Sequence, residues 1–243
     1  MLPLLLASSQ IFFTPGQPMA PSELSQDFYI ISSKPAKPAY LIPEDASAVG
    51  HWNATDLANG TAKIGSPWTT VGTVAFETGV AVRPGVGPFP SGNYYKQTSG
   101  AFSFLAAPFT EVAIWYGAPT GTEQVILGTQ NQELNVGTTN TSGFYYGSNL
   151  YPANAPVSSP SINVTFGGID GSGNCWAQLN GGTAVSTSCS YVGISAQDAL
   201  GVYAGDLATF PATGLKLVEA YATTAVPSAG AFTAIYNAIV ANE

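Results

Sequence analysis

The chain is poor in charged residues. Its 243 residues include six Lys and Arg and fourteen Asp and Glu, which makes 8% charged residues where soluble domains have about 25%. Acid–base catalysis, metal ligation and phosphate binding all draw on these residue types, so little material is left for a catalytic site. Solubility must come instead from Ser, Thr, Asn, Gln and Gly on the surface.

Positive charge is the scarcest, and the formal net charge is −8. The basic residues are Lys34, Lys37, Lys63, Arg83, Lys96 and Lys216. They form no cluster, which excludes a nucleic-acid partner and disfavours an anionic membrane surface. No run of 18 apolar residues is present either, so the sequence predicts no transmembrane helix.

Histidine and cysteine are nearly absent. His51 is the single histidine, and without a nucleophile or base beside it in the sequence we expect a structural role. The two cysteines, Cys175 and Cys189, do not make a zinc site with one distant histidine. They flank the turn signal Asn180-Gly181-Gly182, and a loop over residues 180–184 would place them opposite each other. Cytosolic synthesis argues against a disulfide and later exposure outside the cell argues for one, so both states stay open.

Residues 1–45 form a Pro-rich N-terminal arm. Their prolines are Pro3, Pro15, Pro18, Pro21, Pro35, Pro38 and Pro43. Helix is disfavoured there, and an extended backbone is expected with one short strand at Asp27–Ser32. Such an arm either follows the surface of its own domain or reaches a partner subunit. The apolar run near Met1 lacks a preceding positive residue and is interrupted by Pro3, so we expect synthesis in the cytosol without a cleaved signal peptide.

Residues 46–243 have the alternating pattern of β-strands, separated by Gly, Pro, Asn and Ser. The predicted strands are Thr70–Phe76, Asn93–Gln97, Ala101–Leu105, Thr110–Tyr116, Gln124–Leu127, Glu133–Val136, Gly143–Tyr146, Ser161–Phe166, Cys175–Leu179, Val185–Val192, Leu200–Tyr203 and Leu215–Tyr221. Many short strands with 27 glycines and 18 prolines predict an all-β sandwich or jelly roll. One C-terminal helix is predicted after Ser228, because Phe232, Ile235, Tyr236, Ile239 and Val240 form one apolar stripe.

The order of these pieces resembles a concanavalin A-like lectin/glucanase domain, of the laminin-G-like type found in phage virion and bacterial surface proteins. The resemblance rests on Trp68–Phe76, the central strand Phe109–Trp115, the hairpin Trp176–Gly181, and an ending of Gly214–Tyr221 followed by a short helix. It implies a jelly-roll sandwich of two antiparallel sheets with a C-terminal helix, here following the extended N-terminal arm.

The same resemblance bears on catalysis. Glucanases of this family carry a Glu-x-Asp-x-x-Glu strand, and retaining hydrolysis needs two carboxyl groups about 5–5.5 Å apart. That triplet is absent, and Glu111 and Glu219 lie on separate predicted strands. The acidic calcium loops of plant lectins are absent as well, since Asp170–Asn174 is read better as a plain turn. We therefore expect a protein that is not an enzyme and has no metal or cofactor.

Aromatic residues near loops are candidates for stacking on sugar rings. The preferred patch is Tyr145, Tyr146, Asn149 and Tyr151, because adjacent tyrosines on a strand point to opposite faces and one must face outward. Trp68 and the pair Tyr94–Tyr95 are further candidates. The competing interpretation is that all of these are ordinary core and rim residues of a sandwich.

Two functions are compatible with these features. The first is a structural protein on the outside of a large assembly, foremost a bacteriophage capsid decoration or tail fibre, with the arm docking on other subunits and the jelly roll facing outward. Such a protein would be a homo-oligomer or multicopy, on the virion surface. The alternative is an extracellular or cell-surface carbohydrate-binding lectin module, whose glycan binding would be lost on Tyr145→Ala or Tyr146→Ala. A polysaccharide-cleaving enzyme is the least supported.

Overall fold

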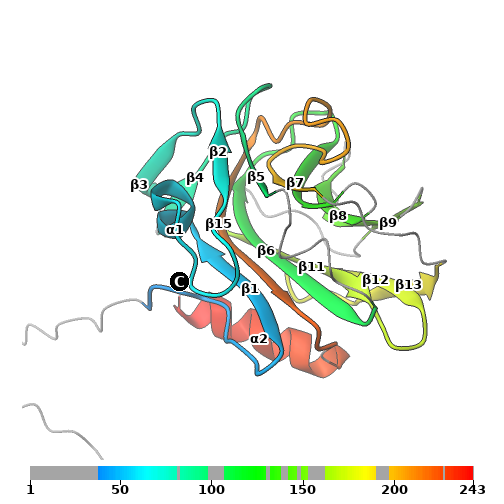
Figure 1. Cartoon of the computed structure of the whole chain (residues 1–243). Coiled ribbons are helices and arrows are strands. Elements are labelled where there is room, and N and C mark those ends of the chain that lie inside the picture. The colour runs from blue at the N-terminus through cyan, green and yellow to red at the C-terminus, as the bar shows by residue number, and fades with distance from the viewer. Residues whose placement is uncertain are drawn as a thin grey trace, which may run out of the picture. The chain divides into compact units, whose positions relative to one another are not determined.

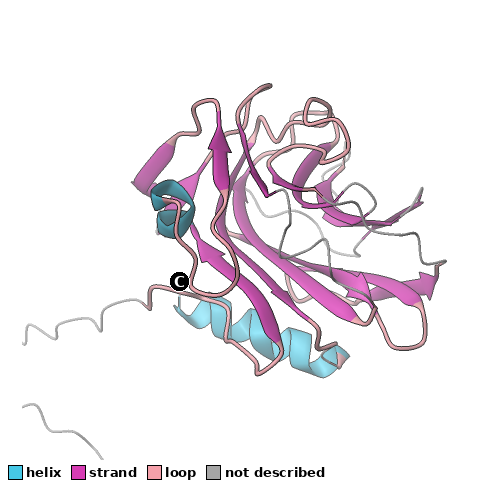
Figure 2. Cartoon of the chain, in the orientation of Figure 1, coloured by secondary structure: helices cyan, strands magenta, loops and turns pink. Residues whose placement is uncertain are grey.

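Two antiparallel β-sheets form most of the structure, a computed structural model of the chain (Figures 1 and 2). It describes residues 38–80, 83–97, 107–129, 132–137, 142–146, 149–152, 162–189, 197–226 and 228–242. The strands are β1 (Ala48–Asn53), β2 (Thr69–Val71), β3 (Phe76–Val80), β4 (Arg83–Val86), β5 (Tyr94–Gln97), β6 (Phe109–Gly117), β7 (Gln124–Thr129), β8 (Gln132–Val136), β9 (Ser142–Tyr146), β10 (Asn149–Pro152), β11 (Asn163–Ile169), β12 (Asn174–Leu179), β13 (Val185–Ser188), β14 (Asp198–Leu200) and β15 (Leu215–Thr223). The helices are α1 (Ala54–Asn59) and α2 (Ala229–Asn242). The predicted all-β class with a short C-terminal helix is confirmed.

The larger sheet has eight strands in the order β13–β12–β11–β6–β15–β4–β3, with β1 also paired to β15. β15 is central: β6 lies along one side, while β4 and then β1 share the other. Pairing with β1 places His51 opposite Tyr221 and Asn53 opposite Glu219. Residues near the two ends of the described chain therefore meet in one sheet.

The smaller sheet has seven strands in the order β10–β9–β8–β7–β14–β5–β2. Leu134 of β8 pairs with Phe144 of β9, and both are fully buried between the sheets. The Phe144 ring meets that of Phe109 from the larger sheet, with centroids 6.1 Å apart. Alternation then assigns Glu133 and Asn135, the neighbours of Leu134, to the outer face of this sheet.

Helix α2 covers the outer face of the larger sheet (Figure 1). The Phe232 ring lies 5.2 Å from that of Phe166 and 4.4 Å from that of Trp176, centroid to centroid. Ser228 accepts a hydrogen bond from the Ala231 N–H, as expected of a helix cap. The predicted start of this helix is confirmed, and Phe232 and Ile239 of the predicted stripe are buried with Ile235 and Tyr236 partly so, but Val240 is exposed. In the described ranges, neither helix has the length and apolar character to cross a membrane.

Residues 38–47, which we call the strap, lie over the same face. Leu41 and Ile42 are buried there in one cluster with Phe232 and Tyr221. The sequence assigned residues up to 45 to the arm, whereas the compact unit begins at Lys37. The difference arises because prolines predict an extended backbone but say nothing about what that backbone packs against.

Several predicted strands differ from the observed ones. Thr70–Phe76 is divided between β2 and β3. The strand predicted at Val185–Val192 is observed as β13, which ends at Ser188. The strand predicted at Leu200–Tyr203 is observed earlier in the chain as β14, Asp198–Leu200, because the chain leaves the sheet after Leu200. The predicted strands Asp27–Ser32 and Ala101–Leu105 lie outside the described residues.

Cys175 and Cys189 are joined by a disulfide, with their Cα atoms 5.6 Å apart. The predicted register is wrong, however, because Cys175 pairs with Thr187 and Ala177 with Val185. Asn180 and Gly181 both have positive φ, at 50° and 69°, which makes the turn tighter than the expected five-residue loop. The bond therefore joins β12 diagonally to the residue that follows β13.

Candidate functional site

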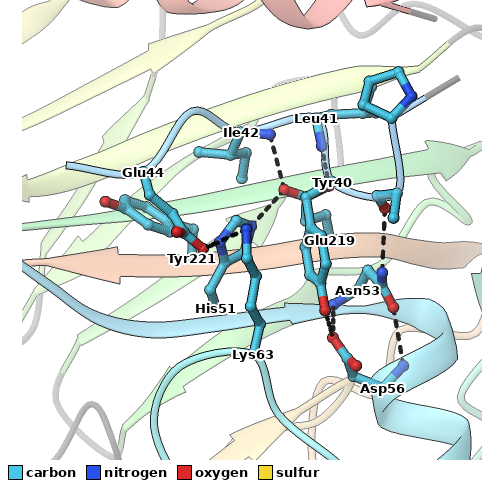
Figure 3. A network of polar contacts seen from close by, with 12 residues as sticks. Tyr40, Leu41, Ile42, Glu44, His51, Asn53, Asp56, Lys63, Glu219 and Tyr221 are labelled. Carbon is cyan, nitrogen blue, oxygen red and sulfur yellow. Dashed lines mark hydrogen bonds and ion pairs between the residues drawn. The ribbon is translucent and has the colours of Figure 1, made fainter.

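His51 lies at the centre of a buried polar network between β1, β15 and the strap (Figure 3). Its Nδ1 is 2.6 Å from Glu44 Oε1, and its Nε2 is 2.7 Å from Glu219 Oε1. An ionised carboxylate only accepts hydrogen bonds, so with both partners ionised the imidazole donates from both nitrogens and carries a positive charge. The sequence shows no acid or base beside His51, yet the fold brings it two carboxyl groups: Glu44, seven residues away, and Glu219, 168 residues away.

The two glutamates of this network differ in surroundings. Glu219 is buried, and it also accepts the backbone N–H groups of Leu41 at 2.7 Å and Ile42 at 2.8 Å. Glu44 is partly exposed and also binds Lys63. Burial raises the pKa of Glu44, but hydrogen bonds from Lys63 and His51 outweigh it, so this pKa lies below its ordinary value.

Side chains at both ends of the strap complete the network. The Tyr40 hydroxyl donates to Asp56 Oδ2 at 2.6 Å, and the Tyr221 hydroxyl donates to Asp45 Oδ2 at 2.9 Å. The carboxylate of Glu219 is thus bound by two backbone N–H groups of the strap and by the imidazole of His51. We infer that the hydrogen bonds and ion pairs of this network hold the strap against β15, which agrees with the structural role expected for His51.

A second polar group, Glu111, lies inside the sandwich. Its side chain is fully buried, and its Oε1 accepts a hydrogen bond from Gln132 Nε2 at 3.2 Å. Burial raises the pKa of Glu111 well above its ordinary value, and the charge of Asp198 adds to the rise. Within the described residues, no group of three or more His, Cys, Asp or Glu is arranged to hold a metal ion.

The raised pKa of Glu111 predicts a loss of stability with rising pH. The folded chain keeps this proton to a higher pH than the unfolded chain, where a glutamate titrates near about 4.3. Above that value the folded state holds more protons, so the free energy of unfolding falls as pH rises. We expect Glu111→Gln to flatten this fall between about pH 5 and 8 and to raise the Tm at pH 8, by about 2–4 °C per kcal/mol gained.

Thermal unfolding of the two proteins across that pH range measures the effect. Glu77→Gln, a change at a partly exposed carboxyl in a salt bridge with Lys216, is the control and should leave the slope nearly unchanged. If the Tm of Glu111→Gln falls with pH as steeply as that of the native chain, the Glu111 carboxyl is not the cause of the pH dependence.

The third polar group lies on the outer face of the smaller sheet. One row of paired residues crosses all seven strands there: Leu150, Tyr145, Glu133, Gly128, Ala199, Lys96 and Thr69. Asn135 follows Glu133 on the same face of β8, and its Nδ2 donates to Glu123 Oε1 at 2.9 Å. Two acceptors, Glu133 Oε1 and Asn135 Oδ1, are buried and have no hydrogen-bond partner. Such orphaned groups are costly, which makes them candidates for binding a ligand.

Residues 201–212, the β14–β15 loop, extend over this face. The Leu207 N–H donates to Tyr203 O at 2.9 Å, and the Tyr203 N–H to Thr209 O at 3.1 Å, which folds the loop back on itself. A backbone hydrogen bond from Ala204 reaches Glu133. Near the end of the loop, the carbonyl of Phe210 accepts the N–H of Val125 in β7.

Two features of the β14–β15 loop are unusual. Leu207 and Phe210 have φ of 56° and 51°, a region that side chains other than glycine rarely adopt and that is found often at functional sites. Phe210 is also 43% exposed, and its ring lies 6.1 Å from that of Tyr203. The backbone of Phe210 joins β7 at Val125, the residue that pairs with Asn135, so Phe210 lies about 10 Å from β8, two strand spacings away.

Negative charge at this site lies on its rim, at Asp206, while the buried carboxyl of Glu133 favours its neutral form. Burial raises the pKa of Glu133 well above its ordinary value, and the charges of Glu123 and Asp206 add to the rise, against the Ala204 hydrogen bond. Backbone hydrogen bonds from Thr209 and Ala208 lower the pKa of Asp206, so this exposed carboxyl stays ionised. The site is therefore a polar floor with an acidic and aromatic rim.

The predicted sugar-binding residues fall in different rows of the smaller sheet. Tyr145 pairs with Glu133, while Tyr151 pairs with Phe144 in the core-side row. Tyr146 pairs with Gln132 and with Asn149. The backbone thus brings Tyr145 alone of the four into the row of the orphaned acceptors; the side chains of these four lie outside what the structure describes.

The other aromatic candidates are core residues. Trp68 is 3% exposed and packs edge-on against Trp52, while Tyr95 is buried near Phe89. Tyr94 packs beneath the β14–β15 loop with Val202. The competing interpretation of ordinary sandwich aromatics holds for these residues.

Comparisons with known proteins bear on the fold. No protein-family model and no curated protein sequence matches the chain. Its structure is similar to domain 4 of AbnA, a GH43 extracellular arabinanase from Geobacillus stearothermophilus, in complex with arabinotriose (17% identity, TM-score 0.57, 79% of this chain and 100% of that domain). The chain has the lectin-like two-sheet fold.

Two further similarities extend over the same share of the chain. One is to a structure of botulinum neurotoxin type C, whose cell entry depends on two ganglioside molecules (9% identity, TM-score 0.56, 79% of this chain and 51% of that one). The other is to Trypanosoma rangeli sialidase (13% identity, TM-score 0.52, 79% and 33%). At these identities the likenesses show the fold alone.

Proposed function

We propose that this protein is a non-catalytic carbohydrate-binding module, which binds a glycan over β8 and the β14–β15 loop. The observation that carries the proposal is the pair of buried oxygens, Glu133 Oε1 and Asn135 Oδ1, which lack hydrogen-bond partners on the sheet face that the β14–β15 loop with its exposed Phe210 covers. Sugar hydroxyls supply donors for such acceptors, and the apolar face of a sugar ring packs on an aromatic side chain. Structures of this fold in complex with arabinotriose and other sugars make the ligand class plausible.

Access to the acceptors requires movement of the β14–β15 loop, because Glu133 and Asn135 are almost fully buried. The strained backbone at Leu207 and Phe210 lowers the cost of that movement, since a residue leaving this conformation recovers about 1–2 kcal/mol. A glycan then replaces part of the loop over the floor of the site, and the Phe210 ring, carried by the moving loop, packs on the bound sugar.

Binding is tested on a glycan array, followed by calorimetry with each glycan that binds. We expect Phe210→Ala to weaken binding about tenfold or more, which is about 1.4 kcal/mol. Phe76→Ala is the matched control, because Phe76 has nearly the same exposure, 39%, on β3 of the other sheet. An equal loss in both variants, or none in Phe210→Ala, contradicts this location of the site.

Display of this module on a virion or another large assembly stays a prediction of the sequence, and so does docking through residues 1–45. Sugar-binding relatives of the fold are compatible with a module that faces outward from such an assembly. They equally support an extracellular protein that acts alone, which is the function we favour. The absence of paired carboxyls in a glucanase strand favours binding without cleavage.

A further inference from the structure

The charges around the β8 site bear on which glycans it accepts. Three carboxyl groups are close enough to interact there: Glu133, Glu123 and Asp206. Asp206 stays ionised through its backbone hydrogen bonds, and Glu123 accepts the Asn135 amide rather than a cation. A bound sugar therefore meets a negative potential.

No described cation compensates this potential. Lys63 pairs with Glu44 of the strap, and Lys216 of β15 pairs with Glu77 of β3, so both are engaged away from the smaller sheet. Arg83 donates to Pro38 O in the strap. Lys96 shares the row of Glu133 but lies three strands away, about 15 Å. Among the residues that the structure describes, a sugar carboxylate placed against the β8 acceptors would therefore find no cation, since Lys96 pairs with Ala199 of β14 at the other side of the site.

The orphaned acceptors point the same way. The Oδ1 atom of Asn135 can only accept hydrogen bonds, and the Nδ2 group of the same side chain already donates to Glu123. Its side chain is fully buried, so an anionic group placed against it would be desolvated and unpaired. A hydroxyl group, in contrast, donates to this oxygen without adding charge.

We infer that the glycan bound by this site is uncharged, and that the site rejects sugars with a carboxylate, such as sialic acids and uronic acids. This inference rests on the proposed function and adds its specificity. Like-charge contacts in a binding site cost several kcal/mol, so an anionic counterpart should bind on the order of 100-fold more weakly. The specificity would thus differ from that of a binding domain solved in complex with SialylT.

The test uses an array that carries each neutral chain with and without a terminal sialic acid, and calorimetry on the pairs that contain a binder. We expect the neutral member to bind and the sialylated member to bind on the order of 100-fold more weakly. The difference in affinity between the two members should become smaller in high salt, because the screening length falls to about 3 Å at 1 M. A gap that is indifferent to salt would be steric and would overturn the inference.

Glu123→Gln keeps an oxygen for the Asn135 amide and removes one charge from the site, and it should reduce the neutral preference about tenfold. Glu77→Gln removes the same charge from the other sheet and should leave the preference unchanged. Equal binding of neutral and sialylated chains overturns the inference but not the proposed function. Failure to bind any glycan overturns both.

Discussion

Glu219→Ala is expected to lower the free energy of unfolding by about 3–5 kcal/mol, the usual cost of removing one partner from a buried charge network. The substitution leaves the N–H groups of Leu41 and Ile42 and the Nε2 of His51 without their acceptor, and all three residues are buried. Each orphaned buried donor costs about 1–3 kcal/mol. The strap should then detach from β15 before the sheets unfold.

Urea unfolding and amide hydrogen exchange at Leu41 and Ile42 measure the two parts of this effect. Glu44→Ala is the matched control, because Glu44 contacts the same imidazole from a partly exposed position. Exposed ion pairs contribute about 0–1 kcal/mol, so this variant should lose little. If both variants lose a similar free energy of unfolding, the main contribution of Glu219 is its contact with His51 and not its hydrogen bonds to the strap backbone.

Phe232→Ala is the second variant expected to have a large effect, with a loss of about 3–5 kcal/mol. Phe232 is 3% exposed and contacts the rings of Phe166 and Trp176, so the truncation opens a cavity under α2. The helix would lose its main anchor on the sheet, and the apolar residues Val112 and Ile114 beneath it would meet water.

The control for this prediction lies in the same helix. Val240 is 45% exposed, so Val240→Ala should change stability by no more than about 0.5 kcal/mol. Urea midpoints of the two variants and of the native chain give the comparison. A loss below about 1 kcal/mol in Phe232→Ala would mean that α2 is held by contacts other than this ring.

The strands and α2 could be predicted because their signals are local. Alternation in Val112, Ile114 and Tyr116 marks one face of β6, and the stripe that contains Phe232 marks the buried face of α2. Helix α1 was missed although its signal is present: Asn53 and Asp56 form a capping box, and Gly60 ends the helix with φ of 64°. Its six residues are too few to show a periodic stripe.

The networks could not be predicted in the same way. Glu219 meets Leu41 across 178 residues of sequence, and only the pairing of β1 with β15 brings His51 between them. The β8 site had a partial signal, because Glu133 and Asn135 alternate with buried Leu134 and Val136 and so face outward. That the β14–β15 loop lies over them depends on a long-range contact that no local pattern shows.

The isolation of His51 has a practical consequence for experiments in solution. Since the chain has one imidazole, its NMR resonances need no assignment, and they come from the point where the strap, β1 and β15 meet. Edge-on contacts with the rings of Tyr40 and Tyr221, at 4.7 and 5.1 Å, should shift these resonances while the strap is docked. One pair of proton signals would then follow strap release in any variant, at any pH and inside any larger assembly that contains the chain.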